Sequence, residues 1–237
     1  MSIWKSISHV LTALTSGQSL LAVFDLLRTK KLHTPNRSVA FTIAIIALGA
    51  KMAKADGQVT RDEVTAFRQI FSLPDSEQQN AARVFNLARQ DVVGFDSYAR
   101  KIAAIFANEP PILIDILEGL FHISMSDGNY HPAEDSFLHE VSQIFGINDQ
   151  CFRALRARYV SGSPQDPFDV LGISPEVSLN NARVAWKMAV RNNHPDRLIA
   201  RGVPPEAIKL AERRLIAINV AWEEIRKMSQ FLRTQSL

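Results

Sequence analysis

The sequence contains a single cysteine, Cys151, among its 237 residues. One cysteine cannot form an internal disulfide or a cysteine-rich zinc site, which excludes a disulfide scaffold and fits a reducing compartment. Glycine is also scarce, with 10 residues, and β-branched residues do not alternate with polar ones, which argues against a mainly β fold. The hydrophobic fraction of 46% excludes a disordered chain.

A long apolar run is missing near the N-terminus. Residues 6–24 are 19 uncharged residues of which ten are apolar, whereas a bilayer span needs about 20 predominantly apolar residues. No secretory cleavage pattern follows them either. The apolar positions instead recur at helical spacing, so residues 1–37 are predicted to form an amphipathic segment. It either packs on the next domain or lies at a membrane surface with Trp4 among the headgroups.

The net charge of +3 is unevenly distributed. Residues 1–37 carry 5 basic and 1 acidic residues (+4), residues 38–155 carry 9 and 15 (−6), and residues 156–237 carry 13 and 8 (+5). This alternation of sign indicates parts with separate roles.

Residues 38–160 are predicted to form a helical bundle. Residues 38–55 and 112–125 are apolar nearly all round, as expected of helices buried on every side. Amphipathic stretches are predicted to form helices at 61–71, 76–90, 94–107, 132–145 and 148–159. The fold class indicated is therefore all-α.

An internal repeat marks this bundle. Residues 54–63 and 125–134 each place Asp-Gly after an apolar helix and a glutamate near the start of the next helix. Helix-capping residues account for this pattern, with glycine ending one helix and the glutamate capping the next. The repeat resembles the TerB family of helical bundles over residues 38–155. That resemblance implies a candidate divalent-cation site at Asp56, Glu63, Asp127 and Glu134, and the sequence leaves the cap and the cation interpretations both open.

A second domain is predicted after a Ser/Gly/Pro linker at 161–166, over residues 167–237. Ser178 is expected to cap a helix over 179–193, and Pro204-Pro205 to open a long helix to about residue 227. Each helix carries an apolar seam, which predicts an antiparallel hairpin. The seams are Ala182, Ala185, Trp186, Ala189 and Val190 on the first helix, and Ile208, Ala211, Leu215, Ile218, Trp222 and Ile225 on the second.

The opposite face of the first helix carries Arg183, Lys187 and Arg191, spaced four residues apart as one cationic stripe. The tripeptide His194-Pro195-Asp196 follows directly. Because proline disfavours helical geometry in the residue before it, the tripeptide is predicted to lie exposed at the tip of the hairpin.

Four segments carry a resemblance to a known family: residues 168–172, Ala185-Trp186, His194-Pro195-Asp196 and residues 218–222. They resemble the J-domain of DnaJ-type co-chaperones over residues 166–228. With the TerB-like bundle ahead of it, the chain is similar to the DjlA group of bacterial DnaJ-like proteins. Two positions depart from the family pattern. This chain has Met188 where the family often has a second cation, and Asn193 where the family often has an aromatic residue.

This resemblance implies a non-enzymatic role. J-domains dock on the ATPase domain of a DnaK-type chaperone and stimulate its ATP hydrolysis, with no cofactor required. The cationic stripe would meet an acidic surface, and Asp196 would pair with a cation on the chaperone. The implied partner-binding residues are His194, Pro195, Asp196, Arg183, Lys187, Arg191 and Arg197. The bundle would provide localisation or regulation, in the bacterial cytoplasm or at the inner membrane through residues 1–30.

Three alternatives remain at this point. The first is a TerB-like metal-responsive or membrane-surface stress protein. The second is a hydrolase that uses His194 and Asp196, which the absence of an H-x-x-x-H cluster disfavours. The third is nucleic-acid binding through the cationic stripe, which lacks a helix-turn-helix or aromatic platform.

Overall fold

The computed structural model of the chain describes residues 3–12, 20–29, 34–55, 71, 75–91, 93–160 and 166–235. All regular elements in these residues are helices, which confirms the all-α prediction. They are α1 (Ile3–Thr12), α2 (Leu21–Thr29), α3 (Thr34–Ala55), η1 (Asp75–Glu77), α5 (Gln78–Gln90), α6 (Phe95–Ile105), α7 (Pro110–Ser124), α8 (Pro132–Ile144), α9 (Asp149–Tyr159), α10 (Pro167–Leu171), α11 (Leu179–Asn192), α12 (Pro195–Arg201), η2 (Pro205–Ala207) and α13 (Ile208–Gln235).

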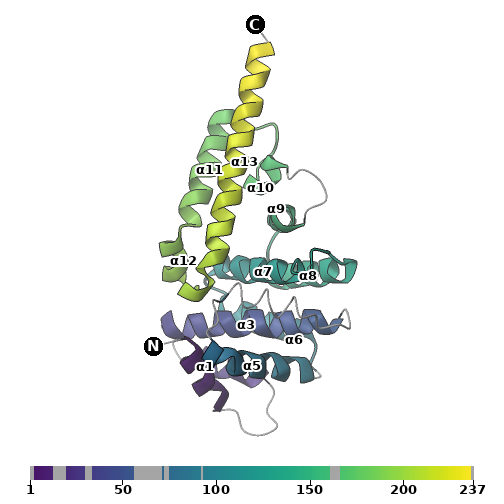
Figure 1. The fold of residues 1–237 in the computed structure, drawn as a ribbon, viewed down its shortest axis with the longest axis vertical. Coiled ribbons are helices and arrows are strands. Elements are labelled where there is room, and N and C mark those ends of the chain that lie inside the picture. Colours follow the sequence, from purple (N-terminus) through teal and green to yellow (C-terminus); the bar gives the residue numbers. More distant parts are fainter. Residues whose placement is uncertain are drawn as a thin grey trace.

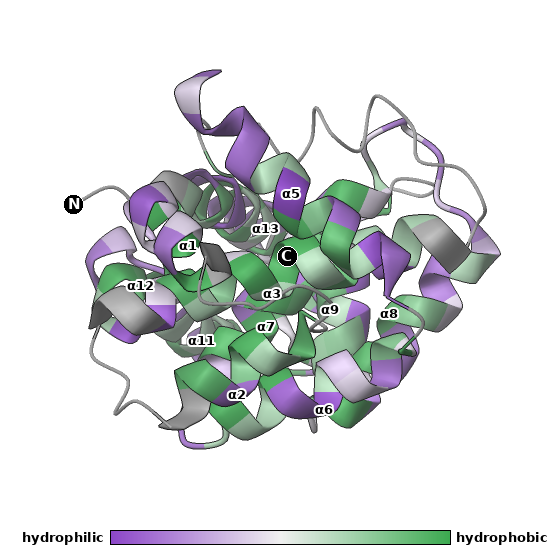
Figure 2. Cartoon of the chain, turned by 90° about the horizontal axis from the view of Figure 1, so that it is seen from below, coloured by the Kyte–Doolittle hydropathy of each residue, from purple (hydrophilic) through white to green (hydrophobic). Residues whose placement is uncertain are grey.

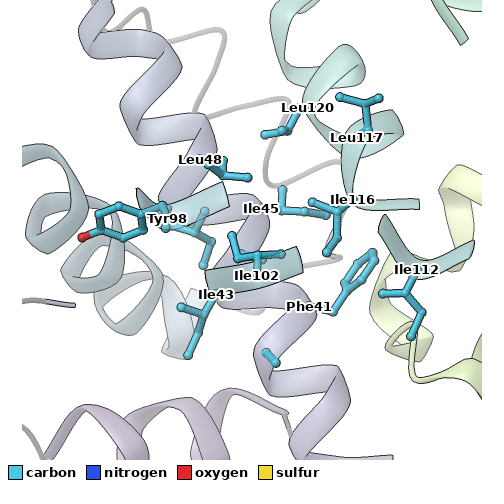
Figure 3. Packing of buried hydrophobic residues seen from close by; sticks show 14 of the residues in the cluster. Phe41, Ile43, Ile45, Leu48, Tyr98, Ile102, Ile112, Ile116, Leu117 and Leu120 are labelled. Carbon is cyan, nitrogen blue, oxygen red and sulfur yellow. The ribbon is translucent and has the colours of Figure 1, made fainter. Parts of the chain in front are cut away.

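Helix α3 forms the centre of the bundle, and residues 39–53 are buried on all sides. It contacts α5, α6 and α7, and the view in Figure 2 shows it as a mainly hydrophobic helix among its neighbours. Figure 3 shows Ile43 and Ile45 of α3 in one cluster with Ile102 of α6 and Ile116 of α7. This arrangement explains the all-round apolar sequence of residues 38–55, because no face of the helix meets water.

The two N-terminal helices use their apolar faces for packing. In α1 the side chains of Ile3, Trp4 and Ile7 are buried, and the Trp4 ring meets Phe71 edge-on at 6.3 Å between centroids. In α2 the apolar face is also buried, with Phe24 edge-on to a tyrosine of α6. Of the two interpretations of this segment, packing on the bundle is the one observed for these side chains. Among the described helices, none combines the length and the hydropathy that crossing a bilayer requires.

The second copy of the repeated turn has the cap structure expected from its sequence. Helix α7 ends at Ser124, Gly128 adopts a left-handed conformation with φ of +83°, and α8 starts with Pro132 at its first turn. The Glu134 carboxylate accepts a hydrogen bond from the backbone N–H of His131 at 3.0 Å. Residues 56–63 of the first copy, including Asp56 and Glu63, lie outside the described residues.

The C-terminal helices form the predicted hairpin, which stands above α3 and α7 in Figure 1 with α12 at its base. Asp166 caps α10, Gly172 ends it with φ of +67°, and Ser178 caps α11. Trp186 and Trp222 stack at 5.3 Å between the two long helices. Helix α13 is longer than predicted, and its first turns pack elsewhere: Leu210 and Ala211 belong to the core of the bundle rather than to the seam with α11.

Candidate functional site

The His-Pro-Asp turn (His194, Pro195, Asp196) joins α11 to α12. His194 occupies the N-cap position of α12, and its Nδ1 accepts a hydrogen bond from the Asp196 backbone N–H at 3.3 Å. Its carbonyl accepts from the backbone N–H of Arg197 at 2.9 Å, while the Arg197 side chain donates to Asn192 Oδ1 at 2.9 Å. The side chains of His194 and Asp196 are 57% and 87% exposed. The turn is thus locally ordered and open to a partner.

The sequence analysis did not predict α12, although its signals are present. Pro195 fits the first helical position, and Gly202 ends the helix with φ of +106°, a conformation that favours glycine. A Cβ on Gly202 would lie 2.6 Å from Cβ of Arg37 in α3, so the helix end touches the bundle closely. The hydroxyl of Ser38 also donates to the Gly202 carbonyl at 2.9 Å. The base of the hairpin is therefore in contact with the bundle rather than free.

The cationic stripe lies on the outer face of α11. Arg183, Lys187 and Arg191 are all exposed, and none of them forms an ion pair with another described residue. Two apolar side chains of α11 are exposed as well: Met188, one of the two departures from the family pattern, is 59% exposed, and Val184, which the sequence did not single out, is 57% exposed. The surface beside the turn is therefore cationic with apolar positions between the charges.

A buried ion-pair network joins the hairpin to the bundle. In α7, Asp115 and Glu118 are buried among apolar residues, and Arg214 of α13 is buried opposite them. Arg214 Nη1 donates to Asp115 Oδ1 at 2.8 Å, and its Nη2 contacts Glu118 Oε2. The signal that could have revealed this network is the pair of carboxylates inside the otherwise apolar stretch 112–125. Its partner in α13 is 99 positions away from Asp115, and no local pattern links the two.

A histidine and an arginine meet at the same interface. Arg213 Nη1 lies 2.8 Å from Nδ1 of His122, and the His122 ring packs against Tyr159 at 6.3 Å between centroids. Burial, with the neighbouring Arg213 charge, lowers the pKa of His122 to about 4. Near neutral pH this imidazole is therefore uncharged beside the guanidinium.

The two described residues of the candidate cation site accept local backbone hydrogen bonds, Asp127 within the turn between α7 and α8 and Glu134 at the cap of α8. Asp127 Oδ1 accepts from the backbone N–H of Asn129 at 2.8 Å, and the Glu134 carboxylate binds the N–H of His131. Among the described residues there is no group of three or more histidine, cysteine or acidic side chains that could hold a metal ion. The other two candidates, Asp56 and Glu63, lie outside the described residues, so a site that includes them stays a prediction.

Comparison with known proteins identifies relatives along most of the chain. The family described as "Tellurite resistance protein TerB" matches residues 42–157. The protein named "Co-chaperone protein DjlA" from Coxiella burnetii is 27% identical over 197 residues, covering 75% of this chain and 73% of the relative. The protein of that name from Aliivibrio fischeri is 26% identical, covering 81% and 79%. The one from Escherichia coli K12 is 23% identical, covering 98% of this chain and 100% of the relative.

No solved structure matches the chain. The matched relatives share one name, and with the Escherichia coli relative the alignment covers both the bundle and the hairpin. The TerB match falls on the bundle, from α3 to α9. With this TerB-like helical domain and these relatives, the chain is similar over nearly its whole length to the DjlA-type DnaJ-like proteins.

Proposed function

We propose that this protein is a J-domain co-chaperone that stimulates ATP hydrolysis by a DnaK-type chaperone. The relatives are named co-chaperones, which supports the general role. In this proposal the chain performs no chemical step itself. Residues 167–237 act as the J-domain, residues 161–166 as the linker, and the bundle localises or regulates the J-domain.

The observation that carries the proposal is the exposed His-Pro-Asp turn at the start of α12. Its backbone is held by hydrogen bonds within the turn, and the His194 and Asp196 side chains point to solvent. A partner can therefore contact both side chains without unfolding the turn. A pre-formed binding element loses little conformational entropy on association, which favours affinity.

The cationic stripe supports an acidic partner surface. Arg183, Lys187 and Arg191 are exposed and make no ion pair with another described residue, so their charges are available to a partner. Complementary charges of this kind accelerate association and orient the partners, more than they increase affinity. The apolar Val184 and Met188 beside them would add desolvated contact area. Arg197, on α12, would extend the cationic surface past the turn.

A single-turnover ATPase assay with the DnaK of the same organism tests the proposal. The wild-type chain is expected to raise the rate of hydrolysis of DnaK-bound ATP, and His194→Gln is expected to abolish that increase. Because His194 is exposed and its side chain makes one cap hydrogen bond, the substitution should leave the circular dichroism spectrum unchanged and lower the free energy of unfolding by no more than about 0.5–2 kcal/mol. Equal stimulation by the wild type and the variant would contradict the proposal.

Location in the bacterial cytoplasm, with a peripheral contact to the inner membrane through residues 1–30, stays a prediction. The burial of Trp4 and Ile7 leaves fewer apolar side chains of α1 for a membrane. Flotation with anionic liposomes, before and after deletion of residues 1–30, measures the contact directly. Flotation that depends on these residues would support it, and the absence of flotation of the full chain would contradict it.

A further inference from the structure

Both ends of the His-Pro-Asp turn connect to one carboxylate of the bundle. Before the turn, Asn193 Oδ1 accepts a hydrogen bond from Arg214 Nη1, the same nitrogen that donates to Asp115 Oδ1 at 2.8 Å. After the turn, Arg201 Nη2 lies 3.4 Å from Asp115 Oδ2 and donates to the carbonyl of Asn192 at 3.3 Å. Asp115 thus connects to the residue directly before His194 and to the last residue of α12.

The position of Asp115 makes these contacts strong. Its side chain is 3% exposed and that of Arg214 4%, so little water screens the pair. A buried carboxylate that loses its cationic partner is left uncompensated, which is far costlier than breaking an exposed ion pair. Glu118, fully buried one turn further along α7, pairs with the other nitrogen of Arg214 and fixes the guanidinium plane. The arginine is therefore held in one orientation.

Helix α12 also packs on the bundle through apolar contacts. Leu198, within α12, and Val203, two residues after it, are buried and belong to the core of the bundle. The bond from Ser38 to the Gly202 carbonyl adds a third connection. In Figure 1, α12 lies at the junction of the hairpin with the bundle, close to the start of α3. The turn is consequently supported from a second domain and not from its own hairpin alone.

We propose that Asp115 is a positioning residue for the His-Pro-Asp turn, acting through Arg214 and Arg201, so that the bundle sets the shape the turn presents to its partner. This inference rests on the proposed function, and it gives the bundle a direct part in it. It also accounts for Asn193, which departs from the aromatic residue frequent in J-domains: an aromatic side chain would offer Arg214 no carbonyl oxygen. The bundle would then determine the conformation of the turn in addition to localising the hairpin.

Amide hydrogen exchange of the full chain, without DnaK, tests the positioning first. Asp115→Asn is expected to increase exchange in residues 192–204 by about tenfold or more, because hydrogen bonds to a charged group are lost. The matched control is Asp135→Asn in α8, a half-buried carboxylate whose ion pair with Arg156 at 2.9 Å lies away from the turn. It should leave that segment unchanged.

A second pair of variants separates positioning from general destabilisation. Asn193→Ala removes the acceptor for Arg214 without touching the bundle and should also increase exchange in residues 192–204. Asn193→Asp keeps an acceptor for Arg214 but loses the amide donor to the Ala189 carbonyl, so it should retain protection. Unchanged exchange in both Asp115→Asn and Asn193→Ala, or equal loss of protection in Asn193→Ala and Asn193→Asp, would overturn the proposal.

The same variants in the DnaK assay connect position to function. Asp115→Asn and Asn193→Ala are expected to raise the concentration needed for half-maximal stimulation, since fewer molecules present the turn in its binding shape. If exchange increases as expected while DnaK responds to no form of the chain, the co-chaperone function fails and the positioning stands. If the wild type stimulates DnaK but neither Asp115→Asn nor Asn193→Ala changes the exchange of residues 192–204, the positioning role of Asp115 is wrong and the co-chaperone function stands.

Discussion

Two helices of this protein begin with the same dipeptide, His131-Pro132 for α8 and His194-Pro195 for α12. Both histidines have extended backbones at the N-cap position, with ψ of 144° and 134°, and both are exposed. Around His131 the caps come from neighbouring residues, such as Glu134 three positions later. Around His194 the support reaches back 99 and 164 positions, from Arg214 to Asp115 and from Gly202 to Ser38.

The surroundings also differ in charge. The first turn of α8 is acidic, with Glu134 and Asp135, whereas the start of α12 adjoins Arg197 and the cationic stripe on α11. One local device, a proline at the first helical position, thus serves a structural cap in one place and a candidate docking element in the other. The two turns thus share a backbone geometry and differ in their neighbours, and in the proposed function it is these neighbours that distinguish the docking element from the cap.

Substitution of Arg214, the arginine at the centre of the buried ion-pair network, should have the largest effect on stability of the changes predicted below. Arg214→Met removes the buried cation that two buried carboxylates share and leaves Asp115 only Arg201 at 3.4 Å and Glu118 only Arg158 at 4.0 Å. We therefore expect a loss of about 3–5 kcal/mol in the free energy of unfolding. Urea unfolding of the full chain measures it. Arg226→Met is the control on the same helix, because Arg226 is exposed and pairs with an exposed glutamate. It should change stability by less than about 0.5 kcal/mol, and an equal effect of the two variants would contradict the network.

A pair of glycines, Gly128 in the turn before α8 and Gly202 at the end of α12, sharpens the comparison of local with long-range support. Gly202 and Gly128 both have positive φ, so alanine costs about 1–3 kcal/mol of backbone strain at each. Gly202→Ala should be the more destabilising, since its Cβ would meet Cβ of Arg37 at 2.6 Å, whereas a Cβ on Gly128 meets nothing within 4 Å. Thermal unfolding of both variants gives the difference. Equal losses would show that the close contact between α12 and α3 contributes nothing.

Acidification should weaken the interface through His122. Its pKa is about 4 in the folded chain against 6.5 ordinarily, so the unfolded state takes up the proton first as the pH falls. The stabilisation from neutral His122 is complete above pH 6.5 and is lost between pH 6.5 and about 4. Urea unfolding across this range should show a steeper decline for the wild type than for His122→Gln. Parallel pH profiles for the two proteins would contradict this assignment.

The smallest effect is expected from reversing a single charge of the cationic stripe, measured as association with DnaK. Lys187→Glu should weaken association with DnaK a few-fold, because an exposed ionic contact contributes about 0.2–1 kcal/mol, and added salt should reduce the difference. Surface plasmon resonance at two ionic strengths measures both. Lys227→Glu, an exposed lysine toward the far end of α13, should bind like the wild type. A salt-independent loss, or a similar loss in both variants, would argue against electrostatic docking.

Much of the fold could be predicted because it depends on local signals. The all-round apolar sequence of α3, the cap by Ser178 and the left-handed Gly172 each reflect residues within one turn of the chain. The hairpin followed from its two seams, of which Ala182, Ile218 and Trp222 are buried as expected. Exposure of the His-Pro-Asp turn was likewise readable from Pro195.

The contacts between domains could not be predicted in the same way. The pairing of Asp115 with Arg214 depends on how α13 lies on α7, and periodicity specifies a face of a helix but not its partner. The seam itself showed this, since Ala211 turned out to pack in the bundle core. Helix α12 escapes prediction for another reason: Pro195 indicates the end of the preceding helix, although proline also begins helices.

The most direct measurement compares the two histidines in one assay of DnaK single-turnover ATP hydrolysis. His194→Gln and His131→Gln make the same chemical change at two exposed histidines, each preceding a proline that begins a helix. We predict that His194→Gln abolishes stimulation while His131→Gln stimulates like the wild type. Loss of stimulation in both variants, or in neither, would contradict the claim that the His-Pro-Asp turn is the acting element of this protein.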